Sequence, residues 1–442
     1  MDDKLILSRY NSLLKDSREN YIVYNSRTNS LLKIPEEFYQ LLNKKTDLEE
    51  FDQDTKTLCI QHKIFVNHEE DNAYYRMKKM EANSRSYSSN ILNLTILPTS
   101  NCNFCCQYCF ETNKKKSVMS EKTIDDLIRF INSYHHTDLQ LTWFGGEPLL
   151  AQKQIRTVLF RIKTETHANL LSHSIVTNGY CLNSHALQLF KEYPLNYIQI
   201  TIDGTKEHHD QTRILKNKKG TFDVIISNLK KTLKELPECL ISIRVNINQT
   251  NKDEFPKIWN YFQQEFKTYR SRILVYPGII KVNDEANKCW TCETLFSKER
   301  SEFYYELNDQ TNIPVSFYPS FKSKGCIATM TNGFVIGSEG EIYKCWSEVG
   351  NLHKSVGNIR YPEKMDAEKN SKYIIGGNCF EAEECKTCAI LPICQGGCPI
   401  ERISNLFEGT HYEMCSIYKD PRILAKSLEL HYSRKTTTCS YE

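Results

Sequence analysis

Hydrophobic and polar residues follow two periods in turn between residues 91 and 276. Short apolar runs typical of strands lie at 91–97, 139–144, 173–177, 197–202, 240–247 and 272–276. Between them, apolar residues recur at the helical spacing i, i+3, i+4 and i+7, as in Ile124, Leu127, Ile128 and Ile131. Repeated strand–helix units predict a parallel sheet with right-handed crossovers. Because six units are fewer than the eight of a closed barrel, we expect an α/β fold built on a partial (β/α)6 barrel.

Two of these predicted strands alternate between apolar and polar positions. In 240–247, Ser242, Arg244 and Asn246 share one face, and in 197–202 Gln199 and Thr201 do the same. Parallel strands buried on both faces are usually apolar throughout. The alternation therefore predicts a polar barrel lumen that binds a ligand.

The chain on either side of the predicted barrel has a different pattern. Strand-like and helical segments over 3–66 predict a small α+β unit, and the polar stretch 67–90 predicts a linker. From about residue 319 the periodicity fades and cysteines dominate, which predicts loops and short turns held by metal. We therefore expect three domains, at 1–88, 89–318 and 319–442.

Composition excludes several classes of protein. The 442 residues are 40% hydrophobic and 25% charged, which is typical of a globular chain, and the net charge of 57 − 54 = +3 does not favour a nucleic-acid partner. There is neither an apolar run near the ~18 residues of a membrane span nor a secretory signal, so we expect a cytoplasmic protein without a membrane partner. Because the cytosol keeps thiols reduced, clustered members of the 18 cysteines indicate metal binding or redox chemistry.

The first cysteine group directly follows the first predicted barrel strand. Cys102, Cys106 and Cys109 are spaced so that a single loop can bring three thiolates to one site. Three protein ligands leave one metal position open, as a catalytic site requires. Ligands also bind at the carboxyl ends of strands in such folds. Cys105 does not fit the spacing.

With Tyr108 and Phe110 on either side of Cys109, this segment resembles the signature of the radical SAM superfamily. The resemblance implies that the three cysteines hold a [4Fe–4S] cluster and that S-adenosylmethionine binds the fourth iron. It also implies that a 5′-deoxyadenosyl radical then abstracts a hydrogen atom from the substrate.

Further segments resemble motifs of the same family. They are Gly145-Gly146-Glu147, Asn178-Gly179, Thr201-Ile202-Asp203-Gly204 and the segment from His209 to Arg213. Glycines permit close backbone approach, a carboxylate accepts hydrogen bonds from an ammonium, and an Arg fork matches the two oxygens of a carboxylate. The expected cofactor contacts are Tyr108, Phe110, Gly145, Gly146, Glu147, Asn178, Thr201, Arg213 and Arg244.

A second cysteine group fills the C-terminal region. By spacing alone, Cys385, Cys388, Cys394 and Cys398 are compatible with a structural zinc site. Together with Cys326, Gly340, Cys345 and Cys415, they resemble the SPASM extension of radical SAM enzymes. The resemblance implies two auxiliary [4Fe–4S] clusters, and so three in all. Cys326, Cys345 and Cys398 would hold the first, and Cys385, Cys388, Cys394 and Cys415 the second. The fourth ligand of the first is open among Cys289, Cys292, Cys379 and an unfilled position.

The family resemblance leaves several activities. In sulfatase-maturating enzymes an Asp follows the second SPASM cysteine, whereas here Trp346 follows Cys345. Residues 1–88 resemble the winged-helix-like domain with which peptide maturases recognise a leader peptide. We therefore expect a maturase that installs a crosslink or similar modification in a ribosomally made precursor peptide, with flavodoxin or ferredoxin as reductant.

Two alternatives to peptide maturation stay open. One is an anaerobic sulfatase-maturating (formylglycine-generating) enzyme, and the other is a non-enzymatic Fe–S electron-transfer scaffold. The scaffold would not need Gly145-Gly146-Glu147. The sequence assigns no catalytic acid or base.

Overall fold

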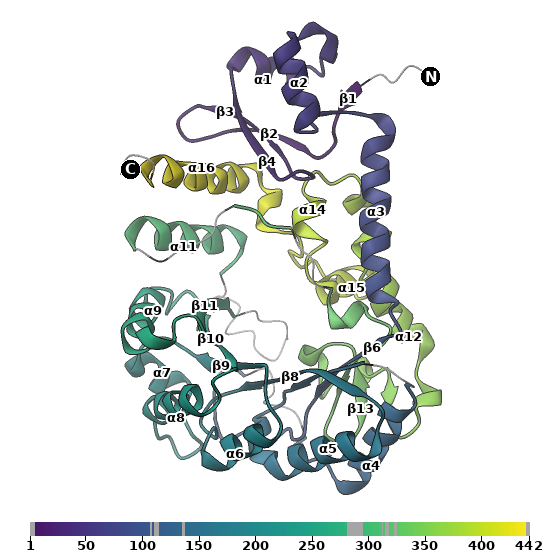
Figure 1. The fold of residues 1–442 in the computed structure, drawn as a ribbon, viewed down its shortest axis with the longest axis vertical. Helices are drawn as coiled ribbons and strands as arrows, with labels where there is room; N and C mark the ends of the chain where they lie inside the picture. The colour runs from purple at the N-terminus through teal and green to yellow at the C-terminus, as the bar shows by residue number, and fades with distance from the viewer. Residues whose placement is uncertain are drawn as a thin grey trace. The chain divides into compact units, whose positions relative to one another are not determined.

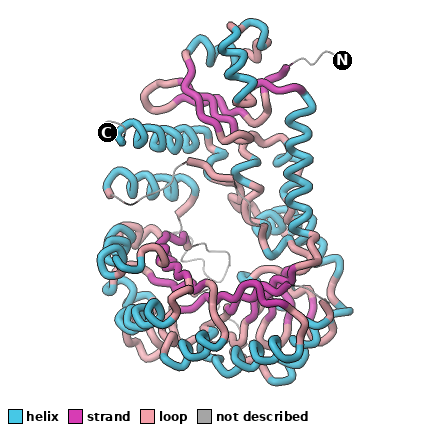
Figure 2. Tube along the Cα trace, viewed as in Figure 1, coloured by secondary structure: helices cyan, strands magenta, loops and turns pink. Residues whose placement is uncertain are grey.

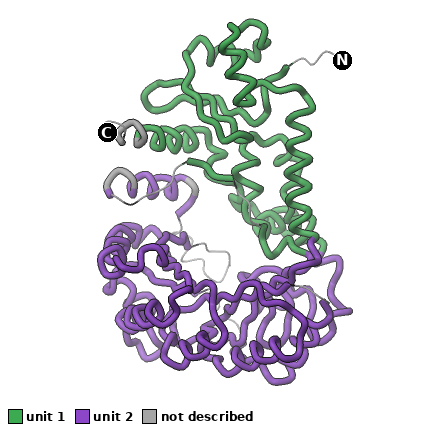
Figure 3. Tube along the Cα trace, viewed as in Figure 1, with its two compact units in different colours: residues 1–87, 314–330, 371–442 green, residues 88–313, 331–370 purple. Residues whose placement is uncertain are grey.

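The structure is a computed structural model that describes residues 5–106, 108–109, 115–134, 138–280, 295–311, 313, 318–321 and 325–438. The chain forms two compact units (Figures 1 and 3). Unit 1 comprises residues 1–87, 314–330 and 371–442, and unit 2 comprises residues 88–313 and 331–370.

Unit 2 is built on a sheet of nine described strands, six of which are parallel and follow one another in chain order. These six are β6 (Ile91–Ile96), β7 (Asp138–Trp143), β8 (Asn169–Thr177), β9 (Tyr197–Ile202), β10 (Leu240–Ile247) and β11 (Ile273–Ile279). Each lies at or beside a predicted strand, so the prediction of a partial barrel is confirmed.

Helices cover one face of this sheet, as Figure 2 shows. They include α4 (Glu121–Asn132), α5 (Gln152–Glu165), α6 (Ser184–Glu192), α8 (Phe222–Glu235) and α9 (Glu254–Glu265). The predicted apolar face of α4 is buried, and so are Ile198, Ile200 and Ile202 of β9, whereas Gln199 and Thr201 are half-buried. The apolar side chains form the core of unit 2. None of the helices in the described ranges is long and apolar enough to cross a membrane.

Three further strands extend the sheet beyond β6. β12 (Gly333–Ile336) pairs in parallel with β6, and β13 (Glu341–Tyr343) and β14 (Gly357–Asn358) continue it antiparallel. We expected loops in this segment. The short apolar run Phe334-Val335-Ile336 is instead buried as a strand, so residues 331–370 belong to the barrel unit.

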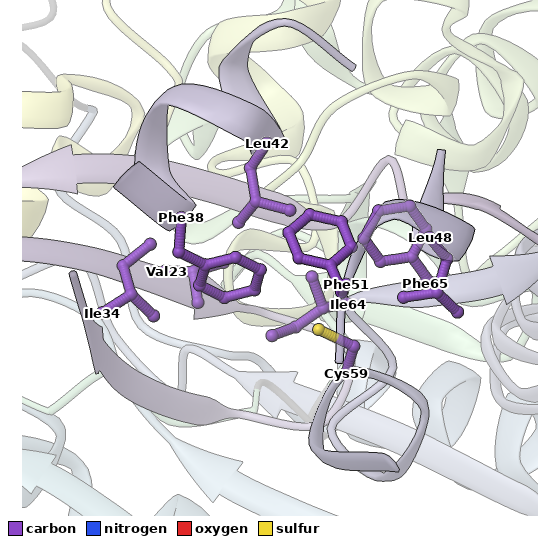
Figure 4. Packing of buried hydrophobic residues seen from close by; sticks show 9 residues of the cluster. All are labelled: Val23, Ile34, Phe38, Leu42, Leu48, Phe51, Cys59, Ile64 and Phe65. Atoms are coloured by element: carbon purple, nitrogen blue, oxygen red, sulfur yellow. The ribbon is translucent and has the colours of Figure 1, made fainter. Parts of the chain in front are cut away.

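The N-terminal part of unit 1 is the predicted α+β arrangement. β2 (Asn11–Lys15), β3 (Tyr21–Asn25) and β4 (Ser30–Ile34) form an antiparallel sheet, and β1 (Leu5–Leu7) pairs with β5 (Phe65–Asn67). Helices α1 (Glu36–Asn43) and α2 (Gln53–Gln61) complete it. Figure 4 shows its core, in which the Cys59 sulfur lies among apolar side chains. Cys59 is thus a small buried hydrophobe.

The predicted linker over 67–90 is wrong, because most of it is helix α3 (His68–Ser86). Asn67 caps this helix by accepting a hydrogen bond from the Glu70 N–H at 2.9 Å. Asp71 is buried and accepts hydrogen bonds from the hydroxyl of Ser8 and the guanidinium of Arg27. The helix is polar because it buries little apolar surface, which makes its sequence look like a linker.

Residues 1–88 also share a core with the C-terminal region of unit 1. Leu14, Ile22 and Tyr24 pack in one cluster with Ile393 of α14 (Leu391–Cys394) and with Leu424 and Leu428 of α16 (Pro421–Thr438). The expected boundary at residue 88 coincides with the division after residue 87, but the segment before it is not a compact unit of its own. Its winged-helix-like character stays a prediction.

Candidate active site

The loop that carries Cys102, Cys106 and Cys109 follows β6 and is held first by the glycines after β7. The Gly146 N–H donates to the Thr99 carbonyl at 3.3 Å, and the Glu147 N–H donates to the Asn101 carbonyl at 2.8 Å. A Cβ on Gly145 would overlap the Thr99 carbonyl oxygen, and one on Gly146 would overlap that of Asn101. Gly145 also has a φ of +124°, so glycine is required there by both space and conformation.

Two further contacts fix the loop on its other sides. The Asn178 side-chain amide, at the end of β8, donates to the Asn103 side-chain oxygen at 2.8 Å. The Cys105 N–H donates to the Ile214 carbonyl at 2.8 Å, and Phe104 forms a β-bridge with Leu215. The cysteine loop is therefore positioned from three directions at the carboxyl ends of the parallel strands.

Glu147 is completely buried and joins the end of β7 to the end of β8. Its carboxylate accepts hydrogen bonds from the Thr177 hydroxyl at 2.7 Å, the Asn178 N–H at 2.7 Å and the Leu149 N–H at 3.0 Å. Burial raises the pKa of Glu147, and these donors oppose the shift. A carboxylate has roughly four acceptor positions, so these bonds leave about one for a ligand.

A largely buried polar network lies at the ends of β9 and β10. The Tyr108 hydroxyl donates to the Asp203 carboxylate at 2.5 Å, and it accepts hydrogen bonds from Arg213 at 2.7 Å and Asn246 at 3.0 Å. Arg244 Nε donates to the Asn246 side-chain oxygen at 2.9 Å. Burial raises the pKa of Tyr108, which keeps its proton on the phenol. The two predicted cofactor arginines are thus joined through Asn246 and Tyr108.

Two atoms of this network are buried without a hydrogen-bond partner. They are Nε of Arg213 and Oδ1 of Asp203, although Arg213 Nη1 lies 3.9 Å from that oxygen in an ion pair. A buried polar atom without a partner costs about 1–3 kcal/mol, which a bound ligand can recover. These atoms therefore mark a polar ligand site beside the cysteine loop.

Sequence reasoning omitted two members of this network from the expected contacts, Asp203 and Asn246. The sequence contained features that could have predicted both. Asp203 precedes Gly204 in a segment that resembles a family motif, and Asn246 shares the polar face of its strand with Arg244. Thr201 is half-buried and lies opposite Arg244 in the strand register. Phe110 lies outside the described residues.

The thiols of the loop are the ligand type that an iron–sulfur cluster takes. Burial raises the pKa of the Cys102 thiol to about 12 and that of Cys106 to about 11. In the described part of the chain, no three Cys, His, Asp or Glu side chains are arranged to hold one metal ion. A four-iron cluster takes thiolates as ligands. The donor set therefore fits such a cluster, whose binding would release the thiol protons.

Unit 1 gathers the cysteines of the second predicted auxiliary set. Burial raises the pKa of Cys388, and the neighbouring Cys394 and Cys415 raise it further. Cys385 is influenced by Cys388 in the same way. Between Cys394 and Cys398 the chain reverses through Gln395-Gly396-Gly397, all with positive φ. A Cβ on Gly397 would overlap the Met414 carbonyl oxygen, so the glycine allows the segment before Cys415 to pack closely.

The first predicted auxiliary set is distributed differently. Cys326 and Cys398 belong to unit 1 and Cys345 to unit 2. Cys379, one candidate for a fourth ligand, lies beside Cys385 and Cys394 of the second set and packs against Gly396. The candidates Cys289 and Cys292 lie outside the described residues.

Comparison with known proteins shows which family part of the chain resembles. Residues 96–261, which contain the cysteine loop, the Gly145-Gly146-Glu147 segment and Arg213, match the family model of the radical SAM superfamily. The chain contains a radical SAM domain. S-adenosylmethionine and iron–sulfur chemistry, predicted from the motifs, are thereby confirmed for the family, whereas the number of clusters stays a prediction.

Two curated relatives extend over most of the chain. The cysteine-type anaerobic sulfatase-maturating enzyme of Clostridium novyi is 26% identical over 361 residues, which are 74% of this chain and 93% of the relative. The radical SAM cyclopropyl synthase TigE of Paramaledivibacter caminithermalis is 22% identical over 80% of this chain and 78% of its own. The chain is thus similar to both kinds of protein.

A solved structure supports the fold beyond the barrel. The structure of anSMEcpe with bound AdoMet and Cp18Cys peptide has a TM-score of 0.60 at 20% identity, and covers 79% of this chain and 99% of that one. The match supports, at the level of the fold, the prediction of a radical SAM barrel with a SPASM-like C-terminal region.

We predict that Gly146→Ala displaces the cysteine loop, because its methyl group would lie 2.6 Å from the Ser100 carbonyl oxygen and overlap that of Asn101. The affinity of the iron-loaded protein for S-adenosylmethionine should fall at least tenfold, or about 1.4 kcal/mol, in an equilibrium binding assay. Gly409→Asn is the control, since nothing lies within 4 Å of an added Cβ there and asparagine tolerates the φ of +68°. Equal affinities in the two variants would show that the close approach is not needed.

Proposed function

We propose that this radical SAM enzyme acts in the cytoplasm on a ribosomally made precursor peptide and installs a crosslink or similar modification, with flavodoxin or ferredoxin as reductant. The observation that carries the proposal is the buried network of Tyr108, Asp203 and Arg213, in which Arg213 lies close enough to influence Cys106 of the cysteine loop and Glu147. The solved relative with a bound peptide supports a peptide as the substrate.

We assign the following roles to the chain's own residues. Cys102, Cys106 and Cys109 hold the cluster, which with S-adenosylmethionine supplies a carbon radical able to remove a hydrogen atom from substrate. The remaining acceptor position of Glu147 receives the cofactor's ammonium, and the unpartnered Nε of Arg213 meets its carboxylate. Tyr108 and Asn246 hold Arg213 and Arg244 in place.

The auxiliary clusters are part of the same proposal. Cys385, Cys388, Cys394 and Cys415 hold one, which their mutual influence within unit 1 supports. Cys326, Cys345 and Cys398 hold the other, with its fourth position open. Such clusters give the reaction a place to receive or deliver single electrons.

The residue after Cys345 distinguishes peptide crosslinking from sulfatase maturation as the candidate function. Trp346 stacks on Phe144 with ring centroids 5.6 Å apart and planes 19° from parallel. Phe144 directly precedes Gly145. Because an indole has no site that can accept a proton, it cannot replace the Asp that serves as a base in sulfatase maturation. Sulfatase maturation is still the second candidate function, favoured by the 26% identity over nearly the whole Clostridium novyi enzyme.

Peptide capture is assigned to the N-terminal part of unit 1. Among the described strands, β2 and β4 are the two edges of this sheet, each paired only with β3. Helix α16 contacts β2, and it meets β4 through the Lys33 side chain, which lies over the Tyr432 ring. We assign capture to the backbone edge of β4. An edge strand can take up an extended peptide through its backbone groups. Tethering a leader there would raise the effective concentration of the core peptide.

The cluster assignment is tested by replacing Cys102, Cys106 and Cys109 together with Ala. The reconstituted wild-type protein should contain roughly twelve iron ions and cleave S-adenosylmethionine to 5′-deoxyadenosine when reduced. The triple variant should lose about a third of the iron and all cleavage, because only the first cluster is removed. The matched control is Cys105→Ala, since that thiol is exposed and off the motif spacing. Cleavage by the triple variant at the wild-type rate would refute the assignment.

The substrate class is tested with a sulfatase-derived Cys peptide, using anSMEcpe in parallel as the positive control. We expect no formylglycine by mass spectrometry, because Trp346 occupies the position of the base. Conversion of the Cys peptide at a rate comparable to the control would replace peptide crosslinking by sulfatase maturation as the function.

Leader capture is tested by hydrogen exchange of the full chain with and without a precursor peptide encoded beside the gene. The amides of β4 should exchange at least tenfold more slowly in the complex, while those of β2 stay unchanged. Deletion of residues 1–88 is unsuitable, since it would expose the cluster around Leu424 and Leu428. Binding without protection of β4 would place the peptide elsewhere.

A further inference from the structure

Arg402 is a buried cation placed against a predicted cluster ligand. It lies on α15 (Pro399–Phe407), and its side chain is only 1% exposed. Nη2 donates to the Cys385 sulfur at 3.2 Å and to the Gly396 carbonyl at 3.1 Å. The two hydrogen bonds thereby fix the planar guanidinium group with Nη2 against the Cys385 sulfur.

The positive charge of Arg402 is only weakly compensated. Its one ion-pair partner among the described residues is Glu384, whose Oε1 lies 2.8 Å from Nη1. The Glu384 side chain is 52% exposed, so water screens its charge much more than that of the buried guanidinium. Burial disfavours the charged form of Arg402, but Cys385 and Glu384 hold its pKa above the usual value. An arginine does not lose its proton in proteins, so the charge is permanent.

A second cation lies at another ligand of the same predicted set. Lys419 Nζ donates to the Cys415 sulfur at 3.6 Å. The charges of Cys415, Cys388 and Cys385 raise the pKa of Lys419, with Cys415 contributing most. Because this side chain is exposed, its field is screened more than that of Arg402.

Reduction adds one electron to a cluster and makes it more negative. Nearby positive charge and N–H···S hydrogen bonds stabilise the reduced form and so raise the reduction potential. The effect is largest for a buried charge, where the effective dielectric constant is low.

We propose that Arg402, assisted by Lys419, raises the reduction potential of the cluster held by Cys385, Cys388, Cys394 and Cys415, so that this cluster accepts an electron readily. Glu384 moderates the effect. The inference rests on the ligand assignment made under Proposed function. Arg402 acts through the cluster and is a positioning residue, not a catalytic one.

The test measures the midpoint potential of this cluster by EPR during titration with dithionite. The background carries Cys102→Ala, Cys106→Ala, Cys109→Ala and Cys345→Ala, so that one predicted cluster keeps all its ligands. In Arg402→Gln the midpoint should move to a more negative value. At the background midpoint, the ratio of reduced to oxidised cluster should fall about tenfold, ~59 mV for a one-electron couple.

Further variants are expected to shift the midpoint potential in directions that depend on the charge removed. Lys419→Gln should move the midpoint in the same direction by less, because its charge is exposed. Glu384→Gln should move it in the positive direction, because it removes a counter-charge. Arg402→Lys keeps the charge without the fork and should fall between Arg402→Gln and the background. Arg76→Gln, an exposed arginine of the same unit, is the control and should not move it.

The outcomes separate this inference from the ligand assignment. Background protein without iron would show that Cys385, Cys388, Cys394 and Cys415 do not hold a cluster. Full iron with an unchanged midpoint in Arg402→Gln and Lys419→Gln would overturn the electrostatic role alone. If Arg402→Gln does not fold, the midpoint potentials of Lys419→Gln and Glu384→Gln test the proposal instead. The proposal is refuted if the two midpoints shift in the same direction, or if neither shifts.

Discussion

The site depends on the hydrogen bonds of the buried residue Glu147. Its N–H holds the cysteine loop after β6 at Asn101, and its carboxylate binds Thr177 and Asn178 at the end of β8. One residue of the β7 loop thus connects the ends of three neighbouring strands. A carboxylate buried completely is costly unless its lone pairs are satisfied, so the strand ends have little freedom to move apart. The proposed cofactor site is built on this fixed frame.

The other part of the site differs from the Glu147 frame in that its hydrogen bonds are incomplete. At the ends of β9 and β10, polar groups are buried with their hydrogen bonds incomplete, as Arg213 and Asp203 show. Such a network is unfavourable without a ligand and becomes satisfied when one binds. A rigid frame on one side and an incompletely satisfied network on the other suit a site that must bind a charged, polar cofactor firmly.

In unit 1 the cysteines lie beside a buried positive charge, that of Arg402, whereas in unit 2 hydrogen bonds of Glu147 and Tyr108 organise the site. The cysteine-rich turns of unit 1 bury Ile390, Leu391 and Ile393, and their conformation is also set by glycines with positive φ and by the buried Arg402. The same unit joins the N-terminal sheet to α16 in one apolar cluster. The two ends of the chain therefore depend on each other for stability.

Much of the barrel could be predicted because its signals are local. The strand runs, the helical spacing of α4 and the cysteine spacing each lie within about fifteen residues, and the glycine motif directly follows β7. Local patterns failed where stability comes from distant partners. Helix α3 looks like a linker because it lacks an apolar stripe; the Asn67 cap, the contacts of Asp71 and the packing of Tyr75 on Phe380 hold it.

The sequence by itself determined the order of strands and helices, the family motifs and the residue types available for chemistry. Only the tertiary structure decided that Tyr108 would bridge Asp203, Arg213 and Asn246, and that residues 331–370 would extend the barrel sheet. It also decided that Cys379 would lie with the second cysteine set and Arg402 against Cys385. These contacts join residues far apart in the chain, 138 positions for Asn246 and Tyr108 and 333 − 93 = 240 for Gly333 and Asn93. Their partners are chosen by packing, and no periodicity or spacing along the sequence encodes that choice.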